Sequence, residues 1–90
     1  MTMEKQKTLI NFRKALGTVQ KIIKMTEENQ YCINIMQQNL AAIGLLKSAH
    51  QALLENHLKT CFKNKMNSKS NKQQDVAIDE VLKVSKLSNK

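Results

Sequence analysis

The near absence of helix-breaking residues most restricts what this chain can fold into. Its 90 residues contain no proline and only two glycines. Sandwiches and barrels need many turns, and turns rely on these residues. The composition therefore predicts an all-α protein built from long helices. No apolar run approaches the roughly 18 residues of a membrane helix, and the first residues lack a signal-peptide core. The sequence thus predicts a cytoplasmic protein without a membrane partner.

Three helices are predicted, over about residues 4–28, 31–63 and 75–87, within one domain covering 1–90. The first carries an apolar stripe at alternating spacings of three and four, typical of a helix packed on a partner. The central helix is unusually long and also carries an apolar stripe. The polar, lysine-rich segment 64–74 between the last two helices is predicted to be a loop. A chain this small buries only a modest core, so we expect it to form oligomers.

The formal charge is +8, from fifteen basic and seven acidic residues. Such an excess indicates a nucleic-acid or other anionic partner, or only a soluble surface. Lys7, Lys14 and Lys21 recur every seven residues opposite the first apolar stripe, with Arg13 beside them. This face is either a phosphate-binding surface or a solvated one. No nucleophile–base arrangement is present, so we expect no enzymatic activity.

The stretch LLENHLKTC places His57 and Cys61 four residues apart on one helical face. They could bind one metal ion together, or be incidental residues of a packed helix. Cys32 shares their face but lies about seven turns, or roughly 37 Å, from His57 along a continuous helix. One chain could not then hold an ion with all three. An antiparallel second copy would place Cys32 beside the other chain's His57 and Cys61, with two identical sites per dimer. Gly44 lies near the expected crossing point.

Three segments resemble the CsoR-type copper-sensing repressors, a branch of the CsoR/RcnR/FrmR regulators: EENQYCINIMQQ, LLENHLKTC and AIDEVLKV. The resemblance spans about residues 5–87. It implies antiparallel dimers that pair into a tetramer, and Cu(I) bound by Cys32 of one chain and His57 and Cys61 of the other. Soft thiolates select Cu(I), and imidazole suits it. The resemblance also places Tyr31 and Glu80 around these ligands, at positions that couple the site to DNA release.

The function implied is a repressor that binds double-stranded operator DNA and releases it when Cu(I) binds. The residues expected to contact DNA are Lys7, Arg13, Lys14 and Lys21. Family members usually carry arginines where this chain has Asn11 and Ser48. Two alternatives therefore stay open: a diverged paralogue that binds copper but no operator, and a thiol or persulfide sensor of the same fold. His57 argues against the second, because such a sensor needs no imidazole ligand.

Overall fold

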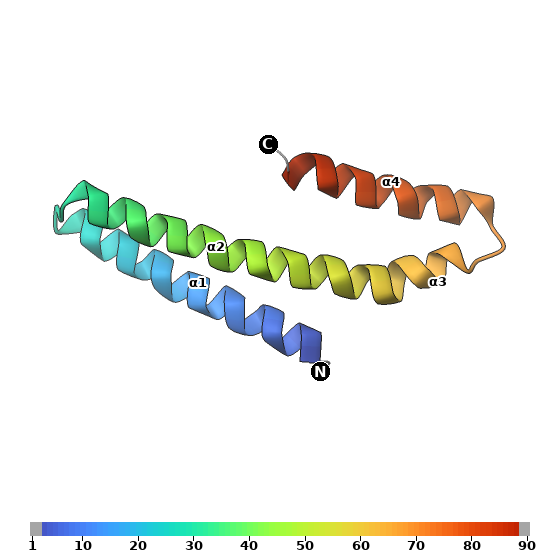
Figure 1. Ribbon diagram of the computed structural model, residues 1–90, viewed down its shortest axis with the longest axis horizontal. Coiled ribbons are helices and arrows are strands. Elements are labelled where there is room, and N and C mark those ends of the chain that lie inside the picture. The colour runs from blue at the N-terminus through green and yellow to red at the C-terminus, as the bar shows by residue number, and fades with distance from the viewer. Residues whose placement is uncertain (1–2, 89–90) are drawn as a thin grey trace. The chain divides into compact units, whose positions relative to one another are not determined.

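The computed structural model describes residues 3–88, which form helices and turns and contain no β-strand. The elements are α1 (Met3–Glu27), α2 (Cys32–His57), η1 (Leu58–Phe62), α3 (Lys63–Met66) and α4 (Asn71–Ser88) (Figure 1). Because α2, η1 and α3 follow one another without a break, the chain has three main helical segments. The predicted all-α fold is confirmed. None of the helices in the described range is both long and apolar enough to cross a membrane.

Contacts divide the chain into two compact units, Met1–Leu54 and Glu55–Lys90. The boundary falls inside α2, so the first unit holds α1 and most of α2. The second unit holds the last residues of α2 together with η1, α3 and α4. The single domain predicted from the sequence stays a prediction.

The first unit is a hairpin of two helices joined by a short turn (Figure 1). Asn29 adopts a left-handed backbone conformation with φ of 55°, which asparagine tolerates better than most residues. The N–H of Gln30 donates to the Met25 carbonyl at 3.0 Å, and the N–H of Asn29 donates to the Thr26 carbonyl at 3.1 Å. This pair of bonds is a Schellman motif, which satisfies the last carbonyls of α1 and reverses the chain.

Small side chains form most of the buried part of this hairpin. The buried residues of the first unit are Thr8, Ala15, Met25, Ala42 and Ala49. No large side chain in the described range is fully buried. The predicted stripe of α1 is mostly exposed instead, with Leu16 60% and Ile23 52% accessible. The helices of the hairpin thus meet through faces rich in alanine, and the larger apolar residues lie outside this contact.

The second unit corrects the predicted loop over 64–74. The connection between α3 and α4 covers only residues 67–70, and α4 begins at Asn71 rather than near Asp75. The side-chain amide of Gln74 donates to the carbonyls of Met66 and Ser68, at 3.1 and 2.8 Å. These bonds close the end of α3 with polar groups, a device that apolar periodicity does not reveal.

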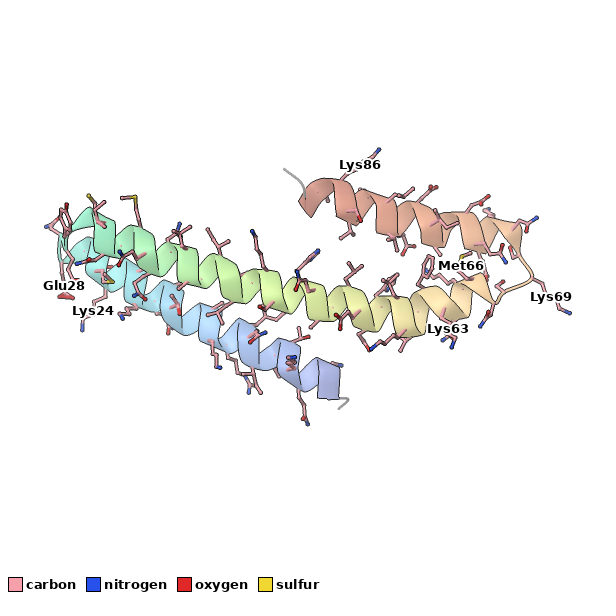
Figure 2. All side chains as sticks on the ribbon, in the orientation of Figure 1. Lys24, Glu28, Lys63, Met66, Lys69 and Lys86 are labelled. Atoms are coloured by element: carbon pink, nitrogen blue, oxygen red, sulfur yellow. The ribbon has the colours of Figure 1, made fainter. Side chains whose placement is uncertain are left out.

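The second unit buries little apolar surface. Ala77 is its buried apolar residue among those described. Figure 2 shows Met66 on the side of α3 toward α4 and Lys63 on the other side. Ser70 caps the start of α4, since its hydroxyl accepts the N–H of Gln73 at 3.4 Å, as a helix-capping serine does.

Candidate metal centre

His57 and Cys61 lie where α2 passes into η1. His57 is the last residue of α2 and is half-buried, whereas Cys61 is exposed and its thiol is free. Residues four apart in an α-helix overshoot one turn by about 40°. The segment Leu58–Phe62 is a π-turn, whose hydrogen bonds span five residues rather than four. His57 and Cys61 thus lie about one turn apart, where the helix changes its hydrogen-bond register.

Thr60 stabilises this π-turn. Its hydroxyl lies 2.7 Å from the Asn56 carbonyl oxygen and 3.7 Å from the sulfur of Cys61. A hydroxyl has one proton to donate, and sulfur is a weak acceptor. The carbonyl therefore takes the proton, and the Cys61 sulfur keeps its capacity to bind a metal. A threonine bonded to the carbonyl four residues back also bends a helix locally.

Cys32 lies at the opposite end of α2, as its first residue, and is exposed with a free thiol. Tyr31 precedes it, and its side chain is 67% exposed. The Tyr31 backbone carbonyl accepts the N–H groups of Asn34 and Ile35, at 3.0 and 3.3 Å. Tyr31 thus starts α2 through its main chain, and its phenol is left accessible.

One chain does not bring the three predicted ligands together. Because α2 runs unbroken over 26 residues, Cys32 and His57 are separated by about 37 Å of helix. Within residues 3–88, no group of three His, Cys, Asp or Glu side chains is close enough to hold a metal ion. The donor types nevertheless suit a soft cation, since both thiols are free and accessible and thiolates prefer soft metals. Each end of α2 therefore offers part of a ligand set.

Glu80 is held by a partner that sequence reasoning missed. Its carboxylate lies 3.2 Å from the Lys65 ammonium, and the two side chains are 46% and 40% exposed. An ion pair this exposed contributes about 0–1 kcal/mol, so it exchanges easily. The pairing was hidden because Lys65 falls in the segment predicted as a loop. The expected role of Glu80 beside His57 stays a prediction.

The predicted DNA-contacting side chains all lie on α1. Lys7, Arg13, Lys14 and Lys21 are exposed. Asn11 is half-buried and Ser48 exposed, so both reach the surface. The basic residues are accessible to a polyanion, and their role stays a prediction.

The model of one protein family, described as metal-sensitive transcriptional repressor, matches residues 4–86 of the chain. The chain belongs to this family. Metal-sensitive repressors are not enzymes, so the expectation of no enzymatic activity is confirmed.

Individual relatives indicate which branch of the family the chain resembles. The copper-sensing transcriptional repressor CsoR of Mycobacterium ulcerans is 37% identical over 62 residues, covering 69% of this chain and 53% of that protein. CsoR of Mycobacterium tuberculosis is 34% identical over 62 residues, with 69% and 52% covered. The copper-sensing repressor RicR of M. tuberculosis is 35% identical over 60 residues, with 67% and 62% covered.

These relatives confirm the resemblance to the CsoR-type copper-sensing repressors. The chain spans about half the length of the CsoR proteins it matches. Because these relatives sense copper, they support a copper-sensing repressor as the role of this chain.

Proposed function

We propose that this family member is a Cu(I)-responsive repressor that binds operator DNA in the cytoplasm and releases it when Cu(I) binds. The observation that carries the proposal is the division of the ligands between the two ends of α2. Cys32 begins the helix, and His57 and Cys61 lie at its end. Because this helix is continuous, a second chain would complete the site, and the copper-sensing relatives support copper as the metal.

An antiparallel second copy of α2 would complete both sites at once. The face of α2 that carries Cys32 also carries apolar side chains that are exposed in the single chain: Met36, Ile43, Leu46 and Leu53. Gly44 lies near the expected crossing point, and a side chain there would meet open space beyond its own helix. Burial of this apolar surface would favour a dimer. The stripe exposed on α1 provides further apolar surface for pairing dimers into a tetramer.

In that dimer, Cys32 of one protomer and His57 and Cys61 of its partner would hold the ion. Two thiolates and an imidazole form a soft donor set that suits Cu(I) better than hard cations. Glu80 would accept the N–H of the His57 ring nitrogen that does not bind the ion, and so fix the orientation of the ring. To do so it must exchange Lys65 for His57, and the exposure of that ion pair makes the exchange inexpensive. Tyr31, which precedes Cys32 in the chain, would help to couple the copper site to DNA release.

DNA binding would use the basic face of α1, repeated over the protomers. The lysines of this face supply point charges for phosphates, and Arg13 supplies one guanidinium. Copper can lower DNA affinity only if Cu(I) and DNA prefer different conformations of the oligomer. The pair of α2 helices would hold one Cu(I) at each end. It is therefore the element whose geometry Cu(I) and DNA would set differently.

The test measures binding of the protein to its own upstream region and to scrambled DNA at near-physiological salt, each with and without Cu(I). We expect tighter binding to the upstream region and a loss of that binding on addition of Cu(I). Equal affinity in all four measurements would contradict the repressor proposal.

A second candidate is a copper-binding paralogue without operator binding. Asn11 and Ser48 favour it, because they stand where family members usually have arginines. Lysine cannot replace the bidentate contact of arginine with a guanine. Tight Cu(I) binding combined with equal affinity for upstream and scrambled DNA would support this candidate.

A further inference from the structure

A second basic surface lies in the Glu55–Lys90 unit, on residues other than those of α1. Between Glu55 and Asp75 the chain contains five lysines and no acidic residue. We name these residues the lysine turn: Lys59, Lys63, Lys65, Lys69 and Lys72. All are exposed except Lys65, which is half-buried. Figure 2 shows Lys69 extending from the tip of the connection between α3 and α4.

A shallow pocket of about 460 Å³ lies within this surface. Its lining residues are Lys65, Ser70, Lys72, Gln73 and Val76. Two ammonium groups, a hydroxyl and a side-chain amide can all donate hydrogen bonds to oxyanions. Charged donors bind phosphate oxygens more strongly than neutral ones do. The pocket therefore has the chemistry of a phosphate-binding surface.

We propose that the lysine turn is a second DNA-contacting surface, which binds phosphates of duplex DNA and does not read bases. The inference rests on the proposed function in its choice of duplex DNA as the partner. Lysine binds phosphate as a flexible point charge and lacks the planar fork that recognises a guanine. The lysine turn would therefore add affinity and salt dependence to DNA binding without adding sequence preference.

The composition of the segment favours DNA over a membrane surface. Basic segments that bind membranes combine their charges with apolar side chains that enter the lipid. From Lys63 to Asp75 the only strongly apolar side chain is that of Met66, and it is half-buried. The segment from Lys63 to Lys72, which holds four of the five lysines, thus offers charge without an exposed apolar anchor.

Lys65 contributes least to this surface, because its ammonium already pairs with Glu80 at 3.2 Å. Lys69 and Lys72 flank Ser70, lie outside that ion pair and are exposed. They are therefore the lysines whose removal tests the surface without disturbing Glu80.

The experiment compares K69Q/K72Q with K83Q/K86Q, a matched control that removes two charges from exposed α4 positions. DNA affinity is measured from 50 to 200 mM salt on the upstream region and on scrambled DNA of equal length. Each phosphate contact contributes about −0.9 to the slope of log affinity against log salt. We expect K69Q/K72Q to flatten the slope by about 1.8 on both DNAs for each protomer whose lysine turn contacts the DNA, and the control to leave it near the wild-type value.

The single variants K69Q and K72Q, each expected to flatten the slope by about 0.9 per contacting protomer, decide the matter if the double variant loses its helical circular dichroism. Equal slopes for K69Q/K72Q and the control would overturn the inference. The inference would also be overturned if K69Q/K72Q lost binding to vesicles of phosphatidylserine and phosphatidylcholine while its DNA slope stayed at the wild-type value. A wild-type protein that neither prefers the upstream region nor responds to Cu(I) would refute the proposed repressor. The slopes on scrambled DNA would still decide the lysine turn.

Discussion

The two ends of α2 differ in what they bring to a metal. The start has one thiol, Cys32, in a regular helical turn that begins at the Tyr31 carbonyl. The end has an imidazole and a thiol, His57 and Cys61, about one turn apart where α2 passes into a π-turn. Neither end offers three ligands, and the continuous helix between the two ends keeps them apart within one chain.

With Cys32, His57 and Cys61 as the proposed ligands, one chain alone would contain only parts of a metal centre. A ligand set divided between the ends of a rigid helix can bind tightly only when another chain supplies the missing part. Metal binding is then coupled to the way two protomers pack, which a site within one chain would not require.

Removing a ligand from either end should nearly abolish tight Cu(I) binding. Cys32→Ala alone, and His57→Ala/Cys61→Ala alone, should each weaken it by more than about 100-fold, since even residues behind the ligands cost 10–100-fold. Competition with a Cu(I) chelator measures the affinity. Mixing the two variants under subunit exchange should restore one intact site per heterodimer. A mixture that regains no tight site would show that the ends of α2 do not meet between chains.

Acid should weaken Cu(I) binding at both ends, because each thiol must lose its proton to bind. In the wild type, affinity should rise with pH by about tenfold per unit for each thiol that ionises on binding. In Cys32→Ala, Cu(I) binding should release one proton fewer, so the slope of log affinity against pH should be lower by about one. Chelator competition at several pH values gives both slopes. The same slope in both proteins would exclude Cys32 as a thiolate ligand.

Glu80→Gln tests whether the end of α2 depends on a carboxylate that orients His57. We expect Cu(I) affinity to fall by about 10–100-fold, the usual cost of losing such a partner. Lys65→Met is the matched control, because it breaks the same 3.2 Å ion pair but keeps the carboxylate. It should leave affinity unchanged or slightly higher, since Glu80 is then freed. Equal losses in both variants would mean that Glu80 acts only through Lys65.

Thr60→Val should produce the smallest effect, confined to the end of α2. It removes the hydroxyl that bonds the Asn56 carbonyl at 2.7 Å, a bond worth about 0.5–1.5 kcal/mol. We expect Cu(I) affinity to fall a few-fold, about as much as this energy allows, because the π-turn loses support. Thr18→Val, which removes a similar bond to the Lys14 carbonyl on α1, should lower thermal stability without changing Cu(I) affinity. If both variants bind Cu(I) like the wild type, the Thr60 bond does not set the ligand geometry.

Several features followed from the sequence alone because they depend on local physics. A chain without proline and with two glycines favours long helices, and α1, α2 and α4 appear near their predicted positions. The separation of Cys32 from His57 and Cys61 also follows from sequence, since helical rise converts residue spacing into distance. The family was visible in the segments around these ligands and is confirmed by the family match.

Other features required the tertiary structure, because they depend on polar contacts that have no period in the sequence. The connection before α4 is short because the Gln74 side chain closes the end of α3. The pairing of Lys65 with Glu80 joins α3 to α4 across a turn that composition suggested was a longer loop. The π-turn at Leu58–Phe62 changes hydrogen-bond register without changing residue type.

The larger apolar residues show most clearly which features follow from sequence and which require the tertiary structure. The sequence determined that α1 and α2 each carry an apolar stripe, since side-chain polarity repeats with the helical turn. Only the structure showed that alanines fill the contact inside the hairpin and that stripe residues such as Leu16 and Leu46 stay exposed. Periodicity identifies an apolar face, but which neighbour covers it depends on how the helices pack in three dimensions.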